Sequence, residues 1–334
     1  MINIKALKKY CNPSYLTIRN DKLIINNKRL ARLSRDKIKK IEDDFEIPVI
    51  YSRSYEEVSQ KMGRYISKYK IISPKDKLIV GLSGGKDSLA LLHLLEPYRR
   101  RFGIEIYAIT VDLNINNIRP WSESNKNTEI IKKHCESLNI PHRIISFDKD
   151  VVKMSEILSK NTKGIEYSPC FSCSVVRRYI LTNFAMKLSI EMKNILRTEE
   201  LNKKVKICLG HTLDDNSDTI LANILKGDII RTLEPLKEFN ESVFDFKEFK
   251  LKLQKSTIIR PLLSVSEKDI INALNECNIT YYRDKEECPF SRDKGDSIRK
   301  KSHEVLDYLE KDVGNIREMV VSSILKSIEY YKNS

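Results

Sequence analysis

The residues most suited to chemistry follow a short apolar run, Leu78–Leu82. They read Ser83-Gly84-Gly85-Lys86-Asp87-Ser88, and a segment with helical character, Leu89–Leu92, comes next. Glycines let backbone N–H groups approach a phosphate, and the start of a helix adds its dipole. Each exposed dipole contact contributes only about 0.3–1 kcal/mol, so the hydroxyls and the lysine must converge on the same anion. The stretch predicts a phosphate site rather than an ordinary glycine turn.

A second candidate stretch, Gly210-His211-Thr212-Leu213-Asp214-Asp215, ends one apolar run and opens a helical one. In the functional interpretation, Gly210 lets adenine approach the backbone and one aspartate faces the reacting base or Mg²⁺. In the structural interpretation, Asp214, Asp215 and Asp218 only cap the helix. Two adjacent aspartates near a phosphate loop favour the first. Asp112 ends another predicted strand and could contact the adenosine or be a surface carboxylate.

Among seven cysteines, Cys170 and Cys173 form a C-x-x-C pair at the start of a predicted helix. They lie on one helical face, and the dipole with the neighbouring Arg177 and Arg178 would lower the pKa of both thiols. Cys288, in Glu-Glu-Cys-Pro, is a candidate third ligand. Three arrangements stay open: a 4Fe–4S cluster held through three irons, tetrahedral zinc with a fourth donor, or a redox dithiol without Cys288. Cys208 lies in an apolar run and is predicted to be a core residue.

The chain from Lys75 onward alternates strand-like and helix-like segments. The predicted strands are Lys77–Leu82, Ile104–Val111, His142–Phe147, Val205–Leu209 and Thr257–Ile259. The predicted helices are Ser88–Leu95, Ser122–Leu138, Val151–Lys160, Ser174–Met192, Asp215–Leu225 and Ser266–Glu276. This alternation predicts an α/β fold with a doubly wound parallel sheet, in which ligands bind at the carboxyl ends of the strands.

The domain prediction has three parts. Residues 1–74 form a basic N-terminal extension, with a hairpin (Tyr15–Ile18 and Lys22–Ile25), a basic stretch at Lys28–Lys40 and a helix at Tyr55–Tyr69. Residues 75–290 form the catalytic domain, with a polar insertion of unassigned role at 237–253. Residues 291–334 form two terminal helices, Arg299–Tyr308 and Ile316–Tyr331, whose apolar spacing suits packing in the core or in a homodimer.

Composition predicts a cytoplasmic globular protein that binds a polyanion. The chain has 334 residues, 41% of them hydrophobic, and a net charge of +14. No apolar run approaches the roughly 20 residues of a membrane span, and the first residues lack the apolar core of a signal peptide. The positive charge favours a nucleic-acid partner, although a solvated lysine-rich surface has the same composition.

The loop Ser83–Ser88 lacks the spacing of a Walker P-loop and resembles the SGGxDS loop of PP-loop ATP pyrophosphatases. The wider chain is similar to the tRNA 2-thiolation branch of that family, the 2-thiouridine and 2-thiocytidine synthetases. The resemblance rests on five motifs in order: SGGKDS, CFSCSVVRR, GHTLDDNSDTILANIL, RPLLSVSEKDI and EECPF. It covers the chain from about Ser73 to the C-terminus.

This resemblance implies a reaction. ATP and Mg²⁺ bind at the loop, tRNA supplies a pyrimidine whose C2 oxygen is adenylated, and sulfur displaces AMP. Sulfide, a cysteine desulfurase or a ubiquitin-like carrier would donate the sulfur. Together with the interpretations above, it assigns nucleotide binding to Leu82, Ser83, Gly84, Gly85, Lys86, Asp87, Ser88, Asp112, Gly210 and Asp215. It assigns catalysis to Asp215, Arg177 and Lys86, and ligation of a 4Fe–4S cluster, or alternatively zinc, to Cys170, Cys173 and Cys288.

Two departures from the family pattern leave the target base open. The 2-thiouridine branch carries zinc ribbons at both ends, whereas only Cys11 precedes the loop and no cysteine follows Cys288. Arg177 stands where that branch has lysine, as in the cytidine enzyme, while Glu-Glu-Cys-Pro is typical of the uridine branch. The alternative function is a PP-loop ligase or amidotransferase of the tRNA-lysidine or NAD synthetase type, without a cluster. A third is a non-catalytic RNA-binding protein.

Overall fold

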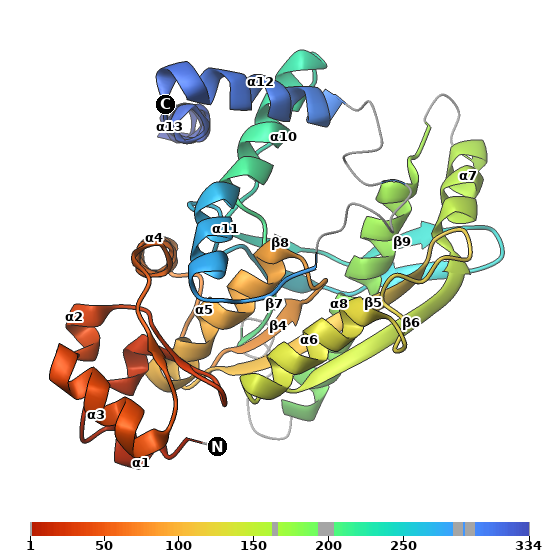
Figure 1. Cartoon of the computed structure of the whole chain (residues 1–334). Helices are drawn as coiled ribbons and strands as arrows, with labels where there is room; N and C mark the ends of the chain where they lie inside the picture. The colour runs from red at the N-terminus through yellow and green to blue at the C-terminus, as the bar shows by residue number, and fades with distance from the viewer. Residues whose placement is uncertain (1, 162–165, 193–203, 283–289, 291–297, 334) are drawn as a thin grey trace.

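The structure, a computed structural model of the chain, describes residues 2–161, 166–192, 204–282, 290 and 298–333. Its centre is a six-stranded sheet in the order β6-β5-β4-β7-β11-β8 (Figure 1). The strands are β4 (Lys77–Gly81), β5 (Glu105–Asn114), β6 (His142–Asp150), β7 (Val205–Cys208), β8 (Leu236–Phe239) and β11 (Ser256–Ile259). All neighbours pair in parallel except β8, which is antiparallel to β11. The predicted doubly wound sheet is confirmed. Because β4 and β7 are neighbours at the switch point, the two predicted motifs end at the same edge.

Helices connect and cover these strands. They are α5 (Lys86–Phe102), α6 (Lys126–Ser137), α7 (Val151–Asn161), α8 (Pro169–Met192), α10 (Leu213–Leu225) and α11 (Glu267–Glu276). The first residues of two of these helices determine where predicted site residues lie. Helix α5 begins directly after Gly85, so the predicted loop runs straight into its first turn. Helix α8 begins at Pro169, which places Cys170 and Cys173 in its first two turns.

The first 50 residues have a small hydrophobic core of their own. This unit contains α1 (Ile4–Leu7), a 3₁₀ turn (Pro13–Tyr15), β1 (Leu16–Ile18), β2 (Leu23–Ile25), α2 (Lys28–Ala31), α3 (Arg35–Phe45) and β3 (Val49–Ile50). The predicted hairpin is the antiparallel β1–β2 pair. Helix α4 (Arg53–Tyr69) instead packs on α11, and its apolar side chains join the core of the large sheet.

The polar insertion at 237–253 contributes one strand to the large sheet and a separate hairpin. Its first part is β8, which extends the large sheet. Its second part is a hairpin of β9 (Ser242–Asp245) and β10 (Lys250–Leu253), and β10 packs on α8. Phe244 of this hairpin meets Phe171 of α8 edge to face, with ring centroids 6.0 Å apart. The insertion therefore supports the helix that carries the cysteine pair.

The two C-terminal helices, α12 (Ile298–Val313) and α13 (Ile316–Asn333), pack on α10 at one end of the molecule (Figure 1). The buried Arg317 of α13 forms ion pairs with Asp214 at 3.2 Å, Asp218 at 2.8 Å and Asp307 at 2.6 Å. Charge as well as apolar spacing thus attaches these helices to α10. No helix in the described part of the chain is both long and apolar enough to cross a membrane.

A buried ion pair joins the two strands whose carboxyl ends carry the motifs. Lys206, on β7, places its Nζ 2.7 Å from Oδ2 of Asp76, which precedes β4, and 3.0 Å from the carbonyl oxygen of Ile71. Both charged side chains are buried. Burial raises the pKa of Asp76 even though Lys206 favours its charged form.

We predict that Lys206→Met lowers the free energy of unfolding by roughly 3–5 kcal/mol, because it leaves a buried carboxylate without its cation. Urea denaturation of the variant measures this loss. The double variant Lys206→Met/Asp76→Asn should recover part of the stability, because an amide needs no counter-charge. Equal stability of the single variant and the unsubstituted protein would contradict this account of the β4–β7 junction.

Candidate functional site

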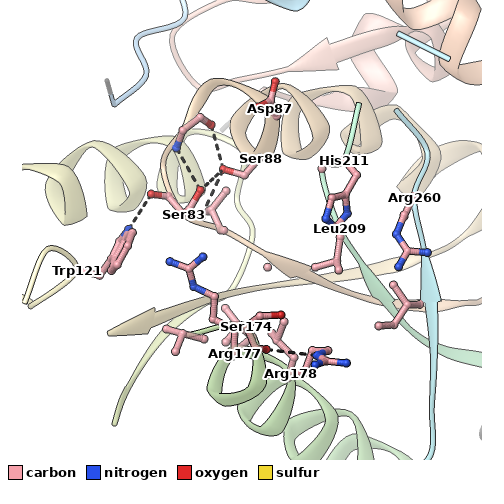
Figure 2. A pocket seen from close by; sticks show the side chains of 18 of the residues that line it. Ser83, Asp87, Ser88, Trp121, Ser174, Arg177, Arg178, Leu209, His211 and Arg260 are labelled. Carbon is pink, nitrogen blue, oxygen red and sulfur yellow. Dashed lines mark hydrogen bonds between the residues drawn. The ribbon is translucent and has the colours of Figure 1, made fainter. Parts of the chain in front are cut away.

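A cavity of about 570 Å³ lies at the carboxyl edge of the sheet, between the strand ends and α8 (Figure 2). This volume suits a small-molecule ligand. Its walls come from strand ends and one helix. They include Leu82, Ser83, Gly85, Asp87 and Ser88 after β4, Val111 and Trp121 from β5 and the segment after it, Gly210 and His211 after β7, Arg260 after β11, and Cys170, Ser174, Arg177 and Arg178 of α8.

The glycine loop, Ser83–Ser88, has the geometry of an anion site. Gly84 adopts a φ of +81°, which side chains rarely tolerate, and Gly85 is the N-cap of α5 without any side-chain cap. The hydroxyls of Ser83 and Ser88 lie 3.2 Å apart, and Ser88 Oγ donates to the Gly85 carbonyl oxygen at 3.0 Å (Figure 2). With no capping side chain, the N–H groups of the first turn of α5 stay available to a phosphate.

Lys86 is held away from the cavity by two carboxylates. Its Nζ lies 3.0 Å from Asp87 Oδ2 and 2.8 Å from Oε2 of Glu267, the first residue of α11. Burial opposes the charge of Lys86, but the two carboxylates outweigh it and raise the pKa of the ammonium group. Lys86 was predicted as a point charge for phosphate. The structure shows it in an ion-pair cluster, and its contact with phosphate stays a prediction. Glu267 was not identified from the sequence.

Asp87 belongs to the cavity wall, but its carboxylate points away from the cavity toward Lys86 (Figure 2). One oxygen, Oδ1, is buried and has no hydrogen-bond partner among the described residues. Burial raises the pKa of Asp87 to about 7, with Lys86 acting in the opposite direction. The Asp87 carboxyl group therefore binds a proton near neutral pH far more readily than an ordinary aspartate.

The aspartates after Gly210 do not line the cavity. Asp215 forms a capping box with Thr212, accepting from its backbone N–H at 2.9 Å, and pairs with Arg299 Nη2 at 2.8 Å. Asp214 accepts from the backbone N–H of Glu267 at 2.8 Å. The helix-capping interpretation describes the contacts of Asp215 present in the structure. The predicted catalytic role of Asp215 toward a base or Mg²⁺ is untested by them.

Gly210 keeps two loops in contact. A Cβ atom at this position would lie 3.1 Å from the backbone carbon and oxygen of Asp87 and 3.2 Å from the backbone nitrogen of Ser88. These atoms belong to the first turn of α5 and cannot rotate away. The residue must therefore be glycine for the end of β7 to pack against the glycine loop, whatever its role toward adenine.

One face of α8 points into the cavity. Cys170, Ser174, Arg177 and Leu181 recur at helical spacing, and all of them line the cavity. The Arg177 guanidinium stacks over the ring of Trp121 at 4.9 Å, and Trp121 Nε1 donates to the Ser83 carbonyl oxygen at 2.9 Å. Arg177 thus lies beside the glycine loop, as a catalytic role requires. Trp121, the single tryptophan of the chain, was not singled out from the sequence, although it follows a predicted strand.

Of the three predicted cluster ligands, the structure describes Cys170 and Cys173. The exposed Cys170 donates its thiol to the carbonyl oxygen of Phe290 at 3.7 Å, and Phe290 comes two residues after Cys288 in the chain. Cys288 itself lies outside the described residues. Within the described ranges no three metal-ligating side chains come together. Cys208 is buried in β7, which agrees with its predicted core position.

Asp112 is a buried residue outside the cavity lining. Its Oδ2 accepts hydrogen bonds from Arg119 at 2.8 Å and Ser146 at 3.0 Å, while its Oδ1 has no partner in the described part of the chain. The adjacent Val111 does line the cavity. Asp112 is therefore not a surface carboxylate, and its predicted contact with adenosine is untested.

Comparisons with known proteins agree with this geometry. The chain matches the PP-loop domain family over residues 54–181 and 191–294. It is 57% identical to a "Probable sulfurtransferase" of Methanocaldococcus jannaschii, over all of this chain and 97% of that relative. It is 29% identical to the "tRNA 2-thiolation protein NcsA" of Haloferax volcanii, over 58% of this chain and 53% of that protein.

A solved structure has the same fold. The U34-tRNA thiolase NcsA from Methanococcus maripaludis, determined with its 4Fe–4S cluster, superposes with a TM-score of 0.57. The match covers 83% of this chain and 79% of that one, at 24% identity. This likeness extends the agreement from the family match to the arrangement of strands and helices.

We predict that Gly210→Ala lowers the free energy of unfolding by about 1–3 kcal/mol and weakens ATP binding at least tenfold, because the added methyl group separates the two loops. Urea denaturation and calorimetric titration with ATP measure the two effects. Gly103→Ala is the control. Gly103, unlike Gly210, has a positive φ, and no atom lies within 4 Å of the position that a Cβ would occupy there. That variant should lose stability while keeping its ATP affinity.

The raised pKa of Asp87 has a consequence for stability. In the unfolded chain an aspartate ionises near pH 3.9, whereas here it ionises near 7, so the folded state holds an extra proton between these values. Stability is therefore lost as pH rises from about 4 to 7. Relative to Asp87→Asn, the unsubstituted protein should lose at most about 4 kcal/mol over this range in urea denaturation. A difference that is constant from pH 4 to 8 would contradict a protonated Asp87.

Proposed function

This chain belongs to the PP-loop domain family and is an enzyme of the sulfurtransferase kind, and from this premise we propose a reaction. We propose that it adenylates the C2 carbonyl of a pyrimidine in tRNA with ATP and then exchanges that oxygen for sulfur. The C2 oxygen attacks the α-phosphorus, the bond to the β-phosphate oxygen breaks, and pyrophosphate leaves. Sulfide then attacks C2, and the C2–O bond breaks to release AMP.

One observation carries the proposal: a single cavity is lined by the glycine loop, by Arg177 and by Cys170. A glycine turn before a helix serves many phosphate ligands, and a cysteine pair serves many metals. A nucleotide site that shares its walls with a thiol suits a reaction that needs both activation by ATP and the transfer of sulfur. A ligase or amidotransferase would need only the first.

The residues can be given roles in the first half-reaction. The hydroxyls of Ser83 and Ser88 and the open N-terminus of α5 would hold the phosphates of ATP, with Mg²⁺ sharing the charge. Arg177, oriented by Trp121, would stabilise negative charge on the α-phosphate as pyrophosphate leaves. Lys86 and Glu267 would act from behind the loop by fixing the position of Asp87. Asp215 would act as the predicted catalytic aspartate if its carboxylate can leave Arg299 when substrate binds.

The donor set suits a 4Fe–4S cluster better than a structural zinc. Cys170 and Cys173 are thiols three residues apart, and one of them is exposed at a cavity wall rather than enclosed. We propose that they bind the cluster together with Cys288. Held by these three thiolates, the cluster would supply the sulfide that the reaction consumes. Zinc at these residues stays the weaker alternative.

The N-terminal extension is the proposed tRNA-holding element. Helices α2 and α3 and the turn between them carry six exposed cations: Arg29, Arg32, Arg35, Lys37, Lys39 and Lys40. The net charge of +14 agrees with a polyanionic partner. The match to the family model begins at residue 54, so these cations lie outside the PP-loop domain itself.

We predict that Cys170→Ser abolishes sulfur transfer, by at least about 100-fold, and keeps ATP–pyrophosphate exchange in the presence of tRNA, because the thiol serves only the second half-reaction. Mass spectrometry of tRNA nucleosides measures the first and radiolabelled pyrophosphate the second. Visible absorbance of the anaerobically purified protein should fall in the same variant. Cys11→Ala, in the N-terminal core, is the control and should change neither activity.

Other results of these experiments would support one of the alternative functions or the zinc site. Full activity of Cys170→Ser would select a ligase or amidotransferase, which needs no thiol. A colourless protein with one zinc per chain would select the zinc site. No pyrophosphate exchange in the unsubstituted protein would favour the non-catalytic RNA-binding interpretation.

A further inference from the structure

Two arginines of the cavity form no ion pair in the described part of the chain. Arg178 of α8 and Arg260 at the end of β11 both line the cavity, and neither forms an ion pair with any described carboxylate. Arg260 is 7% exposed and donates through Nη1 to the Glu234 carbonyl oxygen at 2.8 Å. Its buried Nε has no hydrogen-bond partner in the described ranges. A guanidinium group has five N–H donors, so most of those of Arg260 are left for something else.

Both arginines lie on the β11 side of the cavity. Arg178 and Thr182 are four residues apart on one face of α8, and Thr182 Oγ1 accepts from the backbone N–H of Gln254, just before β11. β11 is separated from β4 by β7, so the two strand spacings put it about 10 Å from the glycine loop's strand. In Figure 2 both guanidinium groups are drawn on the side of the cavity away from Ser83 and Trp121.

The wall between the two charged ends contains two leucines, and His211 also lines the cavity there (Figure 2). Leu181 of α8 and Leu209 after β7 meet over Gly81, where a Cβ atom would lie 3.4 Å from the first and 3.2 Å from the second. Both leucines line the cavity. A planar base can lie against such a wall, whereas a phosphate cannot. The cavity therefore offers an anion site at the glycine loop, a middle lined by two leucines and His211, and a second cationic end.

Without a bound ligand, removal from water destabilises the charged guanidinium groups of Arg178 and Arg260. Burial lowers the pKa of both Arg178 and Arg260, which means that removal from water disfavours their charged forms. A buried cation is normally offset by a carboxylate in direct contact, as Arg317 is by three. The Glu234 carboxylate favours the charged form of Arg260 from a distance, but it forms its ion pair with Lys237. An arginine with a purely structural role would have its N–H donors satisfied by the protein. Arg260 instead lines the cavity, and its buried Nε has no hydrogen-bond partner among the described residues.

We propose that Arg178 and Arg260 form a second oxyanion subsite that binds a phosphate group of the nucleic-acid substrate. The inference rests on the proposed function, because it takes the substrate to be RNA. The glycine loop has its own donors for the phosphates of ATP, and the leucines in the wall between the two ends suit the base that is to react. A phosphodiester next to that base would reach Arg178 and Arg260 while the base lies near Leu181 and Leu209.

The test compares Arg178→Met and Arg260→Met with Arg64→Met, which removes an exposed arginine of α4 from outside the cavity lining. The probes are bulk tRNA over a range of salt concentrations and ATP alone. Each cavity variant should bind tRNA about tenfold more weakly and lower the salt slope by about 0.7, the loss of one phosphate contact. ATP affinity should change less than about twofold. Arg64→Met should match the unsubstituted protein in both measurements.

Two results would overturn the subsite. If ATP binding falls tenfold and tRNA binding is unchanged, the arginines hold the phosphates of the nucleotide. If neither changes while the melting temperature falls, they are structural. Circular dichroism checks folding, and Arg178→Met keeps the test decisive if Arg260→Met does not fold, because Arg178 is only half-buried. Absence of both pyrophosphate exchange and thiolation in the unsubstituted protein would refute the proposed function alone, since the tRNA comparison of Arg178→Met with Arg64→Met would still decide the subsite.

Discussion

The close contact between Gly210 and the first turn of α5 is the constraint on which the site depends. Adjacent parallel strands lie about 4.8 Å apart, and the chains that leave β4 and β7 must turn without colliding. A glycine at the end of β7 allows the backbone there to touch the backbone of Asp87 and Ser88. The glycine loop is therefore supported by a second loop that lies far along the chain from it. Its shape does not rest on its own residues alone.

A series of ion pairs and one hydrogen bond connects the glycine loop to the C-terminal helices. Lys86 pairs with Glu267, the backbone N–H of Glu267 donates to Asp214, and Asp214 pairs with Arg317 of α13. Asp214 and Arg317 are buried and Lys86 and Glu267 are partly buried, so the loss of one contact leaves its partner without a counter-charge or hydrogen bond. The aspartates after Gly210 thus have two uses that the same residues can serve. They cap α10, and they attach α11 and α13 to the back of the glycine loop.

Sequence patterns predicted what is local and missed what depends on topology. The parallel strands of the large sheet and the helices between them follow from apolar periodicity within short windows, and the structure confirms them. The strands β8, β9 and β10 were missed, because their segment reads as polar. The partners of Lys86, Arg177 and Asp214 lie far from them along the chain. Nothing in the local pattern around Glu267, Trp121 or Arg317 marks them, because an ion pair or a stacked ring is visible only once the strand order is known. The aspartates illustrate the difference, since their position at a helix start was predictable and their partners were not.

Helix α8 shows how one element can combine two chemistries. Helical periodicity puts a thiol, a hydroxyl and a guanidinium on one face, and packing on β4, β5, β7 and β11 turns that face toward the strand ends. The insertion hairpin contacts the same helix through Phe171 and Phe244. Arg177, stacked on Trp121, lies beside the glycine loop, two turns of α8 after Cys170. Because one helix carries both groups, helix geometry sets the distance between the proposed sulfur site and the proposed nucleotide site. A substrate base would then meet both groups in one cavity.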